Sequence, residues 1–320
     1  MNENYRLMKR LTFLILLLTC VLSQLPAQTP VAYLRSMREV SVTSPSSLLS
    51  HDHVPVYSEN NMLLVPGKVN GVRGFFLLDT GSPSLVVDSK LVPGSGQIIG
   101  GQSVDGQTVS LQEVQVDEVV YRNRTFREVK ALSLDLSHLN ELVEDPILGL
   151  LGKDWIAQQP SVLDFKRNHI LYFSESDRIA WRARKPVAVS PITWADHIPV
   201  ISVSIHGQNY RFGIDSGSSD NLIDPRVLSK LTPEEIKVLD CIDLQGLSGD
   251  LIRTDLIQLE EVRLTVDQPA DSASFIVMDL TSVRHADGDS LDGLIGVSFL
   301  KNTIFSIDYQ QSKILWWAVK

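Results

Sequence analysis

The sequence predicts an all-β protein of two lobes, and three observations support this fold class. Short apolar segments bounded by Gly, Pro and Asn recur along the chain, as expected for strands. Helical patterns are short and occur only between these segments. The third observation is a duplication: Val69–Asp88 (VNGVRGFFLLDTGSPSLVVD) aligns without a gap with Ile205–Asp224 (IHGQNYRFGIDSGSSDNLID), and Gly149–Phe165 aligns with Gly293–Tyr309. One structural unit is therefore expected twice.

Both copies are predicted to use strands in the same order. The strands expected in the first copy are Met62–Val69, Gly74–Leu78, Ser84–Val87, Val114–Val120, Arg127–Leu134 and Ile170–Phe173. Those expected in the second copy are Val200–Ile205, Tyr210–Ile214, Asn221–Ile223, Ile257–Thr265, Ser274–Met278 and Ile314–Trp317. The second copy carries extra residues, for which we predict a short helix at Thr232–Leu239, with Thr232 as N-cap, Pro233 at N1 and Glu235 at N3.

The first 27 residues have the order of a secretory signal peptide. Arg6, Lys9 and Arg10 precede the apolar run Leu11–Leu22, which is shorter than the roughly 20 residues of a spanning helix. Cleavage is expected near Ala27, with Ser23 as an alternative site. The mature protein would be periplasmic or secreted, and retention of the segment as an uncleaved membrane anchor is the alternative.

The repeats and the leader divide the chain into five parts. The predicted parts are a signal peptide at 1–27, an N-terminal segment at 28–60, a first lobe at 61–177, a connector at 178–197 and a second lobe at 198–320. Residues 28–60 could be a linker, a removed pro-segment or a strand that covers a sheet edge. The sequence leaves these three possibilities open.

Composition excludes several classes of protein. The chain has 320 residues, of which 43% are hydrophobic and 21% charged, which suits a globular protein with a sizeable core. Its formal net charge of −9 and the lack of a basic run argue against nucleic-acid binding. Its two cysteines, Cys20 and Cys241, exclude a disulfide framework and a cysteine-based zinc site. Cys241 is expected to be buried and inert. No cofactor and no metal are expected.

One motif occurs in both copies directly after an apolar strand. It reads Asp79-Thr80-Gly81-Ser82 in the first copy and Asp215-Ser216-Gly217-Ser218 in the second. Two apolar residues and a Gly follow later in each copy, at Leu150-Leu151-Gly152 and Leu294-Ile295-Gly296. A single Asp-Thr-Gly is a weak signal, because Asp and Gly are common in turns. Its recurrence with the same flanking strands makes it specific.

This pattern resembles the pepsin- and retropepsin-type aspartic proteases, over roughly Met62 to Lys320. The stretch Gly149–Trp155 (GLLGKDW) is more similar to bacterial retropepsin-like domains than to pepsin. The resemblance implies a bilobal acid protease fold in which Asp79 and Asp215 form the catalytic dyad. It also implies supporting roles for the rest of the motif. Thr80 and Ser216 would bond to the opposing loop, Gly81 and Gly217 would allow close approach, and Ser82 and Ser218 would hydrogen-bond to the carboxylates.

The resemblance implies an endopeptidase, and physical chemistry explains why it needs both aspartates. Two carboxylates about 3 Å apart cannot both be ionised, so they share one proton. One can then activate a water and the other can protonate the peptide carbonyl. The expected function is hydrolysis of a peptide or protein substrate by a monomer. The alternative is a non-catalytic peptide-binding or assembly protein on the same fold.

Other signals are weaker or depart from pepsin. The predicted flap hairpin Val104–Val109 has no Tyr, and glycine hairpins around Gly106 and Gly249 are predicted as two flaps. His51–His53 could bind a metal, but a solvated turn is favoured. Gly94–Gly101 is interpreted as a flexible loop. Asp88 and Asp224, which also recur, are interpreted as structural caps. The sequence does not define the substrate preference.

Overall fold

The computed structural model describes most of the chain after residue 50. The described ranges are 51–94, 98–103, 108–173, 185–245, 251–265, 270–283 and 288–318, together with the backbone of 12–13, 18–19 and 38–39. Most of the predicted signal peptide and the predicted flap glycines, Gly106 and Gly249, lie outside the described residues.

The N-terminal repeat forms the first of three sheets. Its strands are β5 (Tyr57–Glu59), β6 (Met62–Val69), β7 (Val72–Leu78), β8 (Val86–Asp88), β9 (Ile98–Ser103), β10 (Thr108–Tyr121), β11 (Arg124–Leu134) and β12 (Ile147–Leu151). The short strands β2 (Leu18–Thr19) and β3 (Arg38–Glu39) are added beside β9 and β11. The strand order is β2-β9-β10-β11-β8-β12-β7-β6-β5.

The C-terminal repeat forms the second sheet with the same topology. Its strands are β16 (Thr193–Ala195), β17 (Ile198–Ile205), β18 (Gln208–Ile214), β19 (Leu222–Ile223), β20 (Ile236–Gln245), β21 (Leu251–Arg263), β22 (Asp271–Val277) and β23 (Gly293–Ile295), with β1 (Thr12–Phe13) beside β20. The strand order is β1-β20-β21-β22-β19-β23-β18-β17-β16. The equivalent strands of the two repeats follow in the same order, which confirms the predicted duplication and the two-lobed, all-β class.

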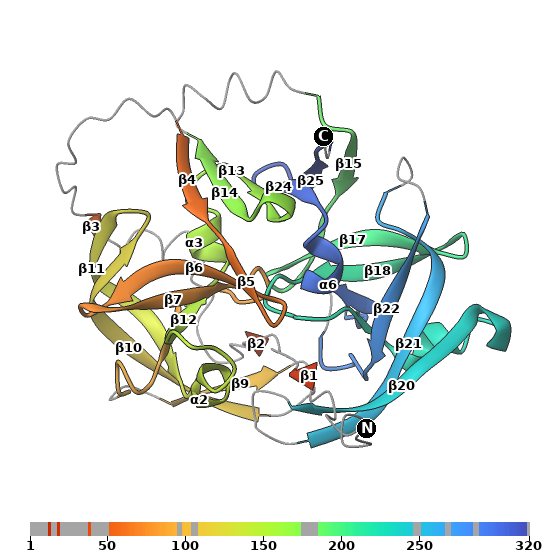
Figure 1. Ribbon diagram of the computed structural model, residues 1–320, viewed down its shortest axis with the longest axis horizontal. Helices are drawn as coiled ribbons and strands as arrows, with labels where there is room; N and C mark the ends of the chain where they lie inside the picture. The colour runs from red at the N-terminus through yellow and green to blue at the C-terminus, as the bar shows by residue number, and fades with distance from the viewer. Residues whose placement is uncertain are drawn as a thin grey trace, which may run out of the picture.

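A third sheet joins the two lobes. Its strands are β4 (His51–Pro55), β13 (Ser161–Asp164), β14 (His169–Phe173), β15 (Ala188–Pro191), β24 (Ile304–Asp308) and β25 (Lys313–Trp316), in the order β15-β25-β24-β13-β14-β4. At its centre Leu163 of β13 pairs with Phe305 of β24, so that backbone hydrogen bonds tie one repeat to the other. Figure 1 shows this sheet bridging the lobes at the top of the molecule.

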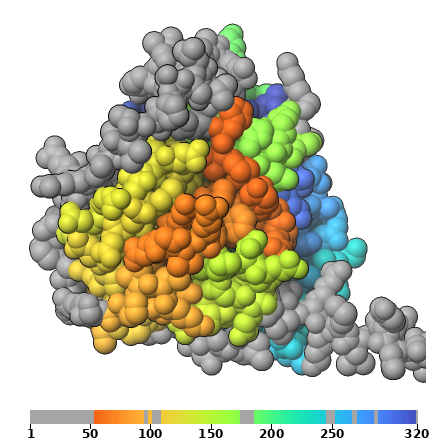
Figure 2. All heavy atoms as spheres, turned by 60° about the vertical axis from the view of Figure 1, so that its left-hand side comes forward, coloured from red at the N-terminus to blue at the C-terminus, as the bar shows by residue number. Residues whose placement is uncertain are grey.

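Helices are short in the described part of the chain. They are α2 (Ser137–Asn140), α3 (Lys153–Ile156), α5 (Pro225–Leu228) and α6 (Val297–Leu300), with 3₁₀ turns η2 (Phe165–Arg167) and η3 (Pro233–Glu235). None of the helices in the described ranges is long and apolar enough to cross a membrane. The elements of the N-terminal repeat, orange to yellow-green, cover one face in Figure 2, with the blue C-terminal repeat at its edge.

Burial on both faces of β7 positions the predicted site. Phe76 and Leu78 point into one apolar cluster and Leu77 into another, and all three side chains are fully buried. In the second repeat, Phe212 and Ile214 of β18 are buried in the first of these clusters. Each Asp-Thr/Ser-Gly loop therefore begins where a buried strand ends, and its first residue has little freedom to move.

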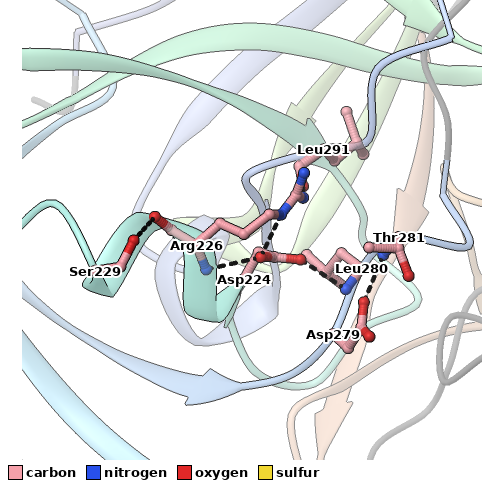
Figure 3. A network of polar contacts seen from close by, with 7 residues as sticks. All are labelled: Asp224, Arg226, Ser229, Asp279, Leu280, Thr281 and Leu291. Carbon is pink, nitrogen blue, oxygen red and sulfur yellow. Dashed lines mark hydrogen bonds and ion pairs between the residues drawn. The ribbon is translucent and has the colours of Figure 1, made fainter.

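Asp224 acts as a structural cap, as predicted. Its carboxylate begins α5 by accepting the backbone N–H of Arg226 at 2.9 Å. It also accepts the Arg226 guanidinium Nε at 2.6 Å and the Leu280 backbone N–H at 2.9 Å, as Figure 3 shows. Burial alone would raise the pKa of Asp224, but these hydrogen bonds lower it overall. Asp88 similarly accepts the Lys90 backbone N–H.

Two predictions in the segment 232–245 are wrong. The predicted capping box is present, with the Thr232 backbone N–H donating to Glu235 Oε2 at 2.7 Å, but the helix ends at Glu235 rather than Leu239. The chain continues as β20, which pairs with β21. Strand alternation then turns Ile242 and Leu244 inward and leaves Cys241 exposed, so this cysteine is not buried.

Two loops predicted near the N-terminus are strands. His51–His53 was expected in a solvated turn, but it belongs to β4, whose backbone pairs with β14. Within Gly94–Gly101, residues 98–101 form the first part of β9, which pairs with β10. β4 pairs with a strand far along the chain, whereas β9 pairs with the next strand, and in both places strand pairing overrides the local turn composition.

Candidate active site

The two aspartate loops are anchored by the strands that carry the Leu-Leu-Gly and Leu-Ile-Gly motifs. β12 runs parallel to β7, and the Asp79 backbone N–H donates to the Leu151 carbonyl at 3.0 Å. In the second repeat β23 runs parallel to β18, and the Asp215 N–H donates to the Ile295 carbonyl at 3.0 Å. The same sequence pattern thus fixes the starting point of both loops.

Glycine is required beneath each loop because the backbone there is closely packed. A Cβ added at Gly152 would lie 2.4 Å from the Ser84 carbonyl oxygen. A Cβ added at Gly296 would lie 2.2 Å from the carbonyl oxygen of Asp220. Both separations are far shorter than a van der Waals contact, so any larger residue would push the loop out of place.

Reciprocal hydrogen bonds lock the two loops together. The Thr80 hydroxyl donates to the Ile214 carbonyl at 3.0 Å and accepts the Ser216 backbone N–H at 2.9 Å. The Ser216 hydroxyl donates to the Leu78 carbonyl at 2.8 Å and accepts the Thr80 N–H at 3.0 Å. Each hydroxyl therefore donates to and accepts from the opposing loop. Because all four bonds are buried, they resist separation of the lobes at this point.

The two carboxyl groups are buried side by side. A Cβ added at Gly217 would lie 2.5 Å from Asp79 Cγ, which shows how closely the second loop approaches the first aspartate. The Gly81 N–H donates to Asp79 Oδ1 at 2.8 Å, and the Gly217 N–H donates to Asp215 Oδ1 at 2.9 Å. Asp215 Oδ2 is buried and has no hydrogen-bond partner within the described ranges. A buried oxygen in this position favours the protonated acid.

The environment separates the pKa values of the two groups. Burial raises the pKa of Asp79 from 3.8 to about 6, although the Gly81 N–H, the charge of His197 and the hydrogen bond with Asp215 oppose this rise. Burial and the charge of Asp79 raise the pKa of Asp215 well above its ordinary value. The pKa values of both groups are therefore raised, and the two carboxyl groups titrate as one coupled pair.

Ser82 and Ser218 do not hydrogen-bond to the carboxylates through their hydroxyls, contrary to the sequence expectation. The Ser82 hydroxyl donates to the Ser84 carbonyl at 3.2 Å, and the Ser218 hydroxyl donates to the Asp220 carbonyl at 2.7 Å. A hydroxyl has one proton to donate, and here that proton closes a turn two residues ahead. The carboxylates accept from backbone N–H groups instead.

Sequence reasoning missed His197, which it placed at the end of the connector without a role. The connector contains strands β15 and β16. His197 lies in the turn after β16, where it contacts the loop of Asp79. There His197 Nε2 hydrogen-bonds to the Gly81 carbonyl. The repeat offset aligns His197 with Asn61, but the positions around them also differ between the two copies, so this alignment does not single out His197.

No group of three or more metal-ligating side chains occurs in the ranges that the structure describes. The site consists instead of two carboxyl groups, the backbone N–H groups that bind them and two interlocked loops. Two β lobes that each supply one Asp-Thr/Ser-Gly loop define an aspartic-protease-type site.

Comparison with known proteins agrees with this class. A model of the aspartyl protease family matches residues 65–155 and again residues 201–299, which together make up more than half of the chain. Each match lies within one repeat and includes its aspartate loop and its later glycine motif. The chain therefore belongs to the aspartyl protease family, as two tandem copies of the family's unit. No curated protein matches it.

Proposed function

We propose that this protein is an exported aspartic endopeptidase in which Asp79 and Asp215 activate a water molecule against a peptide bond. The observation that carries this proposal is the pairing of two buried carboxyl groups with separated pKa values on interlocked loops. Family membership supports peptide hydrolysis, and the basic and then apolar order of residues 6–22 supports export.

The separated pKa values suggest which aspartate takes which role. Ionised Asp79 is the general base, which removes a proton from water as the water oxygen bonds to the peptide carbonyl carbon. Protonated Asp215 is the general acid, which gives its proton to the carbonyl oxygen. When the C–N bond of the tetrahedral intermediate breaks, the leaving nitrogen takes the proton held by Asp79, and one hydroxyl of the intermediate returns its proton to Asp215 as the carboxylic acid forms. No acyl-enzyme forms, and the chemistry needs no metal or cofactor.

The proposed enzyme works as a monomer because both aspartates belong to one polypeptide. Four buried hydrogen bonds between the loops and the shared sheet between β13 and β24 support this assembly. Sizing of the mature chain by light scattering, with activity measured across the eluted peak, tests it. Activity confined to a dimer fraction would contradict the intramolecular dyad.

Cleavage of an unbiased peptide library by the mature chain tests the proposed activity. We expect internal cleavage that a statine-type peptide inhibits, because its hydroxyl takes the place of the attacking water. Cleavage that resists this inhibitor but stops when a chelator or a serine-directed reagent is added would refute the proposed mechanism.

A further inference from the structure

His197 links the second lobe to the loop of the first aspartate. It lies in the turn between β16 and β17, and its side chain is only 7% exposed. Its Nε2 atom hydrogen-bonds to the Gly81 carbonyl, while the N–H of the same glycine donates to Asp79 Oδ1. One glycine thus connects the imidazole to the carboxylate. The Gly81 carbonyl also shares its peptide unit with the Ser82 N–H, which hydrogen-bonds to Asp79 and lowers its pKa.

The hydrogen bonds of His197 select its charged form. A carbonyl oxygen can only accept, so the bond to Gly81 requires a proton on Nε2. The other ring nitrogen, Nδ1, lies 3.2 Å from Asp196 Oδ2. The hydrogen bond from His197 lowers the pKa of Asp196, which keeps that carboxyl group ionised and able only to accept. Both bonds form together only when the ring is an imidazolium.

Charged groups on neighbouring elements surround this imidazolium. Asp196 faces it from its own turn, Asp79 from the catalytic loop and Asp154 from α3, and Lys153 of α3 acts on the same Asp154 and Asp196. Burial raises the pKa of Asp154 to about 6, while the charges of Lys153 and His197 oppose that rise. The Lys153 ammonium is held 4.3 Å from the Trp194 ring centroid. The negative charges of the nearby carboxylates therefore compensate the positive charge of the protonated His197 ring.

Among the residues that the structure describes, no histidine charge acts on Asp215 as His197 acts on Asp79. The charge of His197 lowers the pKa of Asp79, whereas the charge that acts most strongly on Asp215 is that of Asp79, which raises its pKa. The residue that aligns with His197 in the first repeat is Asn61, which is neutral and whose Oδ1 accepts from Lys301 Nζ at 3.4 Å. The two repeats have thus diverged at one position beside the site.

We infer that His197 is a positioning residue that, as an imidazolium, holds the Gly81 peptide in place and assigns the negative charge of the dyad to Asp79. This inference rests on the proposed function, because it concerns the division of roles within the same dyad. The duplication alone would make the two aspartates equivalent. Hydrogen bonding and charge at His197 break that equivalence and make Asp79 the base.

Two substitutions separate hydrogen bonding from charge. His197→Gln keeps an N–H donor near the position of Nε2 but carries no charge, and His197→Ala removes both. In each variant we expect the acid limb of the pH–rate profile to move upward by about one pH unit, because a nearby positive charge no longer favours ionised Asp79. We expect kcat to fall about tenfold in His197→Ala, with His197→Gln restoring most of it and KM within twofold of wild type.

Matched controls make the result decisive. Asn61→Ala, in the equivalent turn of the first repeat, is expected to keep the acid limb and kcat of the wild type. If His197→Gln keeps the wild-type limb, the inference is overturned. If Asp79→Asn still cleaves peptides in the same assay, the proposed function fails instead.

A measurement on the wild type avoids any loss of folding in the variants. Nitrogen-15 NMR of the His197 ring, at the pH of maximal activity, should show both nitrogens protonated. A neutral ring, with one nitrogen unprotonated, would overturn the inference even if the substitutions impair activity.

Discussion

Replacing Asp79 by Asn is expected to abolish hydrolysis and yet stabilise the folded protein at neutral pH. Burial raises the pKa of Asp79 from 3.8 to about 6. The folded state therefore binds this proton more tightly than the unfolded state does. The favourable contribution is fully present below pH 3.8 and is lost as the pH rises through 6. A shift of about 2 pH units corresponds to about 3 kcal/mol of unfolding free energy.

Asn suits this test because it keeps the shape and the hydrogen bonds of the site. Its carbonyl oxygen can still accept the Gly81 N–H, and its amide can donate towards Asp215. It cannot ionise, so the folded protein no longer buries a charge at this position above pH 6. We expect Asp79→Asn to be more stable than wild type by up to about 3 kcal/mol at pH 7, with the difference vanishing near pH 4.

Urea denaturation of both proteins at pH 4 and pH 7, followed by tryptophan fluorescence, measures this difference. Asp224→Asn is the matched control, because the folded-state pKa of Asp224 is lowered rather than raised. Its stability contribution is present above the unfolded pKa and lost as the pH falls, so this variant should be less stable than wild type at pH 7. An identical pH dependence of stability in wild type and Asp79→Asn would show that the pKa of Asp79 is not raised by folding.

Three further predictions concern the same loops. The value of kcat/KM should rise through about pH 6, where Asp79 ionises while Asp215 keeps its proton, and full activity at pH 4 would contradict this. The double variant Ser82→Ala/Ser218→Ala should lose about 1 kcal/mol of stability per site and keep both limbs of its pH–rate profile, since its hydroxyls bond to backbone carbonyls. A moved limb would indicate that these hydroxyls hydrogen-bond to the carboxylates after all. Thr80→Val should lose about 2–3 kcal/mol by removing both buried bonds of its hydroxyl, whereas Thr80→Ser should stay close to wild type in the same denaturation assay.

The duplication explains why so much of the fold could be predicted from the sequence. Apolar runs such as Met62–Val69 predicted strands, and β6 has those same bounds. Recurrence of the aspartate loop at Asp79 and Asp215 then predicted two lobes that face each other. Strand bounds and motif positions depend on nearby residues. Because the unit is duplicated, each such pattern can be recognised in two parts of the chain.

Features that depend on distant contacts could not be predicted. The Ser82 hydroxyl could have donated to a carboxylate or to a turn carbonyl, and only the loop geometry decides between them. Cys241 is exposed because strand alternation and pairing with β21 orient it outward. His197 and Gly81 are 116 residues apart, and nothing near either residue predicts their contact.

The central claim is that Asp79 and Asp215 of one chain form the hydrolytic dyad. Its most direct test is peptide cleavage by four samples at equal concentration: wild type, Asp79→Asn, Asp215→Asn, and an equimolar mixture of the two variants. We expect cleavage by the wild type alone, because neither variant holds both carboxyl groups in one site and mixing cannot unite them. Cleavage by either single variant, or recovery of activity in the mixture, would contradict it.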